Sequence, residues 1–359
     1  YPVFFFIYPL SLTYSLSQSL FSVLYLLEGI YATVAGTTDD DGIDLSSNSS
    51  RLGIKGSHKL SDSLAAVYQF EWGISVDGDG GNLSERNRLV GLKGGFGTFV
   101  LARHDTPMKV VGRKADLFWS TQLGQNRSIT ARDPDGGIGF DLRLNNVIGY
   151  ISPNFGPAHI FAAYSTDHKL GPANPGGSLV NSSGGGDLNN DNDAISVALI
   201  VGGGKKPYYF GAAYEVHNID VAAGQDDESA IRLAGSYKFG PVKVTGFYQL
   251  GSDIAFIAGN DRDLYGLGAA FTAGPNTFKA QWYRADDSDV GAGSDGADMY
   301  AIGWDHALSK STIVYAQYAA LDNDSNGNWF LGGSGHDANA RPTTGEEASG
   351  VSLGMRIKF

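Results

Sequence analysis

The carboxy-terminal stretch Val351-Ser352-Leu353-Gly354-Met355-Arg356-Ile357-Lys358-Phe359 places an apolar side chain at every odd position and a small or charged one at every even position. Successive side chains of a β-strand point to opposite faces. The odd positions would therefore form an apolar face, and the even positions, with Arg356 and Lys358, a polar face. A single strand of this kind suits any half-buried sheet, so the fold depends on how often the pattern recurs.

The composition favours many short strands over long helices. The chain has 359 residues with 50 Gly, 18 Tyr, 19 Phe and no Cys, and its mean hydropathy is -0.15. It is rich in turn formers and aromatic residues but not in continuous apolar runs. No linker-like change in composition divides it, so we expect one domain over residues 22–359. The formal net charge of -12 argues against nucleic acid as a partner, because binding it requires a basic patch.

Residues 1–21 form an atypical apolar segment of unknown role. No charged residue occurs between Tyr1 and Leu27, a length that would allow a transmembrane helix. Pro2 and Pro9 interrupt the stretch, however, and a signal peptide would need a basic start. The first basic residue is Arg51. We therefore expect either an extra apolar part of the mature chain or a stretch that departs from the native sequence.

Short alternating segments follow each other along the rest of the chain, bounded by clusters of Gly, Asn, Asp or Pro. This pattern is typical of strands and turns. Each segment is about ten residues long, the length that a tilted strand needs to cross a bilayer. We predict about sixteen strands, at residues 22–35, 48–57, 63–77, 83–94, 97–106, 145–153, 157–167, 193–201, 207–218, 228–239, 241–252, 262–273, 275–286, 296–307, 310–321 and 349–359.

The connections between these segments alternate in length. Short turns such as 94–97 and 272–275 alternate with long polar loops such as 168–192 and 322–348. Outer-membrane barrels have short periplasmic turns and long external loops. About sixteen to eighteen strands form a barrel that side chains cannot fill. The sequence therefore predicts an all-β fold, a 16-stranded antiparallel transmembrane β-barrel around an aqueous channel.

One connection, at about residues 106–144, is long and has no clear strand. It mixes charged residues with the apolar cluster Leu117, Phe118 and Trp119. A purely solvated loop would not need that cluster, and a loop of this length is more often functional than idle. We expect it to fold into the lumen, pack against the barrel wall and narrow the pore.

Five segments carry a more specific signal: NSSRLGIKGS at 48–57, AAVYQFEW at 65–72, VGLKGGFGT at 90–98, ARHDTP at 102–107 and NVIGYISP at 146–153. Together they resemble the Gram-negative general diffusion porins, particularly the Neisseria-like branch, and the terminal Phe359 is similar to that family's barrel-assembly signal. The resemblance implies a homotrimer in the outer membrane of a Gram-negative bacterium, with the third external loop of each barrel folded into the lumen. It also implies contacts with outer-membrane lipid, lipopolysaccharide and the barrel-assembly machinery, and passive diffusion of ions and small hydrophilic solutes.

In such porins a cluster of wall arginines faces carboxylates on the constriction loop. The basic wall candidates here are Arg51, Arg86, Arg88 and Arg103, with Lys55 nearby, and the acidic candidates are Asp116, Asp105 and Asp133. Opposite charges across a narrow aperture create a transverse field, and rings of charge set ion preference. The alternative interpretation is that these are ordinary solvated charges.

The charges also predict an ion preference. The wall cluster is basic, whereas external loops such as 187–193 and 226–228 are acidic. Screening over about 8 Å weakens distant loop charges at physiological salt, so we expect a weak preference for anions. The acidic run 187–193 could hold Ca²⁺ weakly through oxygen ligands, although a solvated loop is the simpler interpretation. No other cofactor is expected.

Three functions compete, and catalysis finds little support. The seven His residues show no metal-binding spacing, and no nucleophile turn occurs, so we do not expect an enzyme. The first function is the diffusion porin. The second is a substrate-selective channel on the same barrel, which an aromatic slide or a dedicated binding site would distinguish. The remote third is a soluble all-β carbohydrate-binding or hydrolytic protein, which would stay in solution without detergent and would need paired inward carboxylates.

Overall fold

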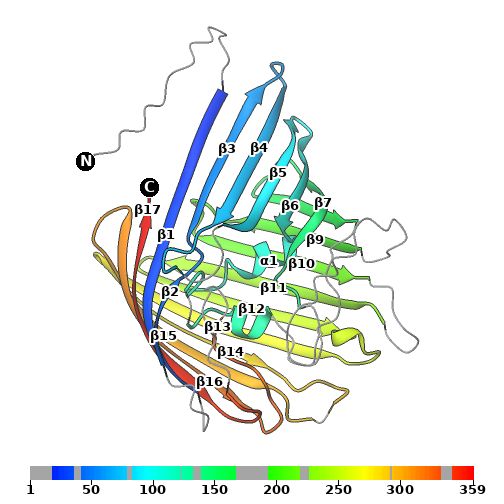
Figure 1. Cartoon of the computed structure of the whole chain (residues 1–359). Helices are drawn as coiled ribbons and strands as arrows, with labels where there is room; N and C mark the ends of the chain where they lie inside the picture. Colours follow the sequence, from blue (N-terminus) through cyan, green and yellow to red (C-terminus); the bar gives the residue numbers. More distant parts are fainter. Residues whose placement is uncertain are drawn as a thin grey trace.

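A computed structural model describes residues 18–35, 42–78, 83–121, 123–131, 139–166, 193–218, 226–291, 293–332 and 342–359. Strands dominate these residues (Figure 1). The strands are β1 (Gln18–Ala35), β2 (Gly42–Ser47), β3 (Arg51–Lys59), β4 (Leu64–Gly73), β5 (Ser84–Gly94), β6 (Gly97–Asp105), β7 (Arg143–Ile151), β8 (Ala158–Ser165), β9 (Ala194–Gly202), β10 (Tyr208–His217), β11 (Glu228–Phe239), β12 (Val242–Ser252), β13 (Arg262–Ala273), β14 (Asn276–Ala285), β15 (Ala297–Ala307), β16 (Thr312–Asn323) and β17 (Ala348–Lys358). The helices are α1 (Pro107–Gly112), α2 (Arg127–Thr130) and the 3-10 helix η1 (Ile254–Phe256). Within the described ranges, no helix is long and apolar enough to cross a membrane.

The strands form one antiparallel sheet that closes on itself. From β3 to β17, each strand pairs with the next one along the chain. β1 closes the ring, because Tyr25 lies opposite Lys358 of β17 on one side and opposite Arg51 of β3 on the other. Figure 1 shows β1 between these two strands. Closure leaves no unpaired sheet edge, which a barrel in a membrane requires.

β2 and β3 are two halves of one wall strand. Both pair with β1, and only residues 48–50 separate them. The interruption coincides with Ser49, whose φ of 57° lies in the left-handed region, a conformation that breaks a regular ladder. Counting the two halves once among the 17 strands gives a wall of sixteen strands, which confirms the predicted fold.

The two faces of the wall differ as the alternation predicts. In β17, Leu353 is 58% exposed whereas its neighbour Ser352 is fully buried. The same order recurs in β9, where Ile195, Val197 and Leu199 are exposed between buried residues. An apolar face turned outward on every side is what a barrel surrounded by hydrocarbon presents.

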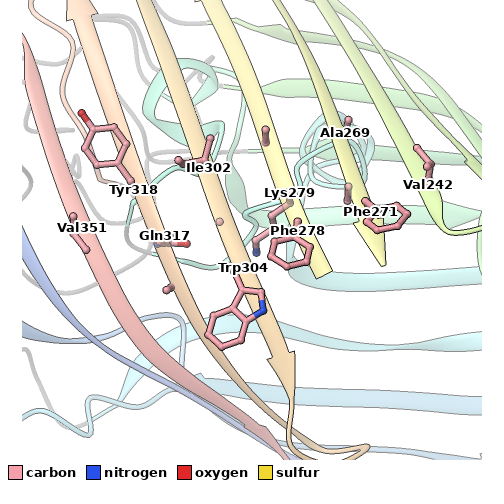
Figure 2. Close-up of a pocket in the computed structure, with 14 residues that line it drawn as sticks. Val242, Ala269, Phe271, Phe278, Lys279, Ile302, Trp304, Gln317, Tyr318 and Val351 are labelled. Carbon is pink, nitrogen blue, oxygen red and sulfur yellow. The ribbon is translucent and has the colours of Figure 1, made fainter. Parts of the chain in front are cut away.

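Part of this outer face is hollowed near the short-turn ends of the strands. Figure 2 shows Phe271, Phe278 and Trp304, from β13, β14 and β15, around a groove of about 630 Å³. Small residues such as Ala269 and Ala280 also line the groove. Large and small side chains therefore share an apolar surface, which suits contact with lipid chains.

The connection between β6 and β7 runs inside the barrel, as predicted. Several of its apolar side chains, among them Met108, Val111 and Phe118, are buried and form one cluster with inward residues of the wall such as Ala198 and Ala301. α1 contacts β8 to β11, and α2 contacts β14 and β15. Figure 1 shows α1 within the curve of the sheet. The loop therefore packs against one side of the barrel, and the opening lies toward β3, β4 and β5.

The predicted strands match the observed ones, with two differences at the amino-terminal end. β1 begins at Gln18 and not at residue 22, and a strand begins at Gly42, before the predicted start at residue 48. The extra residues of β1, 18–21, pair with residues 55–58 of β3, and β2 pairs with residues 28–33 of β1. Pairing at the barrel seam therefore lengthens both strands. Residues 1–17, most of the segment singled out as atypical, lie outside the described residues.

Candidate channel constriction

The constriction loop begins with α1, and its sequence explains why. Thr106 is the N-cap: its Oγ1 accepts a hydrogen bond of 3.2 Å from the Lys109 N–H. Pro107 occupies the first turn, where no N–H partner is needed. Met108 and Val111 are fully buried. This short helix therefore turns its apolar side to the barrel wall as soon as the chain leaves β6.

Hydrogen bonds fix α1 to the wall. The Met108 N–H donates to Ser196 Oγ at 3.2 Å, Arg232 Nη1 donates to the Met108 carbonyl at 3.1 Å, and the Tyr209 hydroxyl donates to the Val111 carbonyl at 3.2 Å. Gly211 of β10 permits this close approach, since a Cβ there would lie 2.9 Å from Val111. The contacts also identify the face of Ser196 as the luminal face of the sheet.

A second anchor holds the middle of the loop against β14. Gln281 accepts from the Leu117 N–H at 2.9 Å and donates to Asp116 Oδ1 at 2.9 Å and to the Gly124 carbonyl at 2.7 Å. Asp116 also accepts from the backbone N–H groups of Phe118 and Asn126. Burial raises the pKa of Asp116 to about 6. The predicted loop carboxylate thus lies at the contact between loop and wall, and none of the wall arginines is among its hydrogen-bond partners.

The returning part of the loop is held by charges. Asp141 forms ion pairs with Arg127 at 2.6 Å and with Arg232 of β11 at 3.8 Å. Lys109 donates to the Asp141 carbonyl at 3.1 Å, and burial lowers the pKa of Lys109 to about 8. Both ends of the loop are therefore tied to each other and to the wall.

Arg51 and Arg86 share one carboxylate on the luminal wall. Glu71 of β4 lies 2.5 Å from Arg86 Nε and 3.9 Å from Arg51 Nη1. Lys55 lies on the same luminal face of β3 as Arg51, because Leu52 and Ile54 between them are exposed on the outer face. These three predicted wall residues lie on the side of the barrel that the loop leaves open.

Asp105 joins the loop to this wall. Its side chain is 4% exposed and lies 2.9 Å from Arg143, 3.3 Å from Arg113 and 3.5 Å from Lys109. Arg143 also donates to Asn87 of β5 at 2.6 Å. This predicted carboxylate is therefore surrounded by cationic groups at the point where the loop leaves and rejoins the wall.

Arg88 and Arg103 lie on the outer face. Arg88 of β5 lies opposite Arg103 of β6 in the strand register, and two residues further along Val90 lies opposite Leu101. Val90 and Leu101 are exposed on the outer face, and side chains two residues apart in a strand share a face. Arg86 has the same parity as Arg88 but differs in face, because β5 has one extra residue between Arg88 and Glu85 relative to β4. Such a bulge reverses the facing of a strand. The structure therefore separates the four predicted arginines into two luminal and two outward residues.

The remaining predicted site residues lie outside the described residues or at the carboxy-terminal end of the chain. Asp133 lies outside the described residues, as does the acidic run 187–193 except Asp193. Phe359 is 73% exposed, next to the barrel seam. Sequence reasoning missed Glu71, Arg143 and Gln281 as site residues. Each is a polar side chain on the luminal face of a strand with alternating polarity, which indicated that it could line the pore. Nothing in the sequence indicated which residues it would contact.

The arrangement defines a class of protein: a transmembrane diffusion channel whose lumen is narrowed by an inserted loop and lined by charged side chains. Closed barrels of this width retain an aqueous passage, and their outer face meets lipid. The passage here runs between the anchored loop and the wall that carries Arg51, Lys55 and Arg86.

Comparisons with known proteins give the family. A model of the Gram-negative porins matches residues 25–326. Outer membrane porin protein 32 of Delftia acidovorans is 31% identical over 323 residues, which cover 87% of this chain and 85% of that protein. Major outer membrane protein P.IB of Neisseria sicca is 23% identical over 341 residues, covering 90% and 88%. The solved anion-selective porin from Comamonas acidovorans is similar in fold, with a TM-score of 0.79 at 24% identity over 95% of this chain and 100% of that chain.

The chain belongs to the Gram-negative porin family. It is an outer-membrane porin that forms a channel for passive diffusion, which confirms the resemblance seen in the sequence.

Proposed function

We propose that this porin conducts ions and small hydrophilic solutes with a preference for anions. One observation carries the proposal: in the described part of the lumen, four carboxylates each contact at least two cationic groups. Glu71 contacts Arg51 and Arg86, Asp105 contacts Lys109, Arg113 and Arg143, Asp141 contacts Arg127 and Arg232, and Asp305 contacts Lys279 and Arg356. Positive charge therefore exceeds negative charge around these carboxylates.

The location of these groups gives the charge its effect. Arg51, Lys55 and Arg86 lie on the open side of the constriction, where a permeating ion passes closest to the wall. Fixed charges at a narrow aperture set ion preference, and acidic external loops more than about 8 Å away are screened. The anion selectivity stated for the Comamonas acidovorans porin supports the same sign. No catalytic step belongs to this role.

The test is the reversal potential of the purified protein in a planar lipid bilayer under a KCl gradient. We expect ohmic single-channel currents and a potential of the sign that chloride permeation gives. A potential of the opposite sign would refute the anion preference, and the absence of current from folded protein would refute the open channel.

We also propose that the porin is a homotrimer whose contact includes the outer face of β4 to β7. Arg88 pairs with Glu85 at 2.8 Å and lies 5.8 Å from the Trp72 ring, on this outer face. A charged residue facing lipid at the midplane costs about 2–4 kcal/mol, so coverage by another protomer would favour these side chains. We expect each insertion event in a planar bilayer to add three equal channels, and chemical cross-linking in the membrane to give a trimer. Insertion of one channel at a time would contradict the proposal.

Three further partners belong to this proposal. Outer-membrane lipid and lipopolysaccharide would cover the remaining apolar outer face, including the groove in Figure 2. The exposed Phe359 would be recognised by the barrel-assembly machinery. Replacement of Phe359 by Ser should lower the amount of porin in isolated outer membranes, and an unchanged amount would contradict that recognition.

A further inference from the structure

An apolar patch runs along the luminal wall from β4 and β5, on the side that the constriction loop leaves open, to β8, which α1 contacts. The luminal patch consists of the partly exposed Val67 and Leu89 and the buried Val100, Val147 and Phe161, from β4 to β8. The strand register makes them contiguous: Gly91 separates Val67 from Val100 across the sheet, and Gly149 follows next to Val100. Together with neighbouring residues they line a hollow of about 350 Å³.

The patch is on the periplasmic side of the constriction. β5 and β6 meet at the short turn next to Lys93, whereas the loop leaves β6 at its opposite end, after Asp105. Short turns face the periplasm in outer-membrane barrels. The helices of the constriction loop pack on β8 to β11, β14 and β15. These strands do not include β4 and β5, where Val67 and Leu89 lie on the luminal face and are partly exposed.

An apolar surface in this place is unusual for a diffusion channel, whose lumen is normally polar. Contact between water and valine or leucine side chains is unfavourable, so binding of an apolar group that covers these side chains lowers the free energy. The hollow therefore has the character of a binding pocket, mostly apolar and within the usual range of about 300–1,000 Å³.

The polar groups of the hollow select the charge of the occupant. Lys55 and Lys93 line it, together with Gln69 and Thr98, and none of its lining residues is a carboxylate. In the described part of the chain, neither lysine has an ion-pair or hydrogen-bond partner. The His104 and Phe161 rings form a T-shaped pair with 5.8 Å between ring centres, which closes one side of the hollow with aromatic surface.

We infer that the hollow is a subsite for organic anions with an apolar body, such as aromatic or short aliphatic carboxylates. The apolar part would lie on Val67 and Leu89, and the carboxylate would lie near the Lys93 and Lys55 ammonium groups. The inference deepens the proposed anion preference and rests on it: anions that enter the channel would dwell in the periplasmic half according to their apolar surface. The channel would therefore discriminate between anions of the same charge.

The experiment measures block of chloride current in single porin channels by benzoate, with acetate as the small anion and benzyl alcohol as the uncharged ring. For the unmodified porin we expect half-block by benzoate at a concentration at least tenfold lower than by acetate, and no block by benzyl alcohol. Equal half-block concentrations for benzoate and acetate would overturn the subsite.

Variants locate the effect. Val67→Thr keeps the side-chain shape, and Leu89→Gln adds a polar group; each should raise the benzoate half-block concentration at least threefold and leave that of acetate unchanged. Val90→Thr, on the outer face of the same β5 strand, is the matched control and should change neither value. Unchanged benzoate block in both luminal variants, with normal chloride conductance, would also overturn the subsite.

The same recordings separate this inference from the proposed function. A reversal potential of the cation sign refutes the anion preference and with it the subsite. An anion-directed potential together with equal block by benzoate and acetate refutes the subsite alone.

Discussion

The Gln281 side-chain amide donates a hydrogen bond of 2.9 Å to the Asp116 carboxylate, joining wall strand β14 to the middle of the constriction loop. The same amide group also bonds Leu117 and Gly124. One wall residue therefore holds three points of a loop that has no regular structure at this position, and we expect the width of the channel to depend on it.

Replacing Gln281 by Leu should release the middle of the loop. It removes three hydrogen bonds and leaves Asp116 and the Leu117 N–H short of a partner, a loss of about 1–3 kcal/mol for each buried group left unsatisfied. We expect larger open-channel current noise and a changed single-channel conductance. Gln317→Leu, which removes a single bond of 2.9 Å to the Leu123 carbonyl, should have a smaller effect. Noise equal to that of the unmodified porin in both variants would contradict this role of Gln281.

The anion preference should increase as the pH falls through about 6. Burial raises the pKa of Asp116 from 3.8 to about 6, so this side chain takes up a proton between pH 8 and pH 5 and the lumen loses one negative charge. The stability of the fold should also increase as the pH falls. Because the pKa of Asp116 is higher in the folded state, its contribution to stability is fully present below pH 3.8 and is lost as the pH rises through about 6.

Asp116→Asn tests this titration. The variant should show the chloride-to-potassium permeability ratio of the acidic state at every pH and lack the step centred near pH 6. Reversal potentials in KCl gradients at pH 5 to 8 measure it. A step of equal size in the variant would assign the titration to another group.

Asp105→Asn should destabilise the barrel and strengthen the anion preference. The side chain is 4% exposed and lies close to Arg143, Arg113 and Lys109, so its neutralisation leaves the buried Lys109 and two partly buried arginines without their counter-charge. Loss of one partner in a buried ion pair costs about 3–5 kcal/mol. The temperature at which the folded barrel unfolds on a detergent gel should fall. Asp62→Asn is the control, since Asp62 pairs with Lys59 but is 98% exposed, and surface pairs contribute about 0–1 kcal/mol.

The facing of the arginines can be tested directly. Arg86→Gln should lower the chloride-to-potassium permeability ratio by about twofold to fivefold, as loss of ~0.5–1 kcal/mol of attraction in water gives. Arg88→Gln and Arg103→Gln should leave the ratio unchanged, because both side chains lie outside the lumen. A drop of similar size in Arg88→Gln would show that β5 faces the other way.

The sequence predicted which segments form the site, but it predicted few of the contacts between individual residues. The mixture of Leu117 and Phe118 with charged residues correctly predicted that the loop packs inside the barrel. The assignment of Asp116 as the carboxylate opposite the arginines had no such basis, because the partner that it found, Gln281, is 165 residues away in sequence. Arg86 and Arg88 have the same parity, and only the bulge between β4 and β5 places them on opposite faces.

The sequence by itself determined the strands, their alternating faces and the order of short and long connections, because each follows from local periodicity and turn chemistry. The tertiary structure decided what local patterns do not contain: the closure of β1 on β17, the side of the barrel that the loop covers, and the carboxylate that each cation meets. Those features depend on distances between residues far apart in the chain, and a bulge of one residue is enough to move a charge from the lumen to the outer surface.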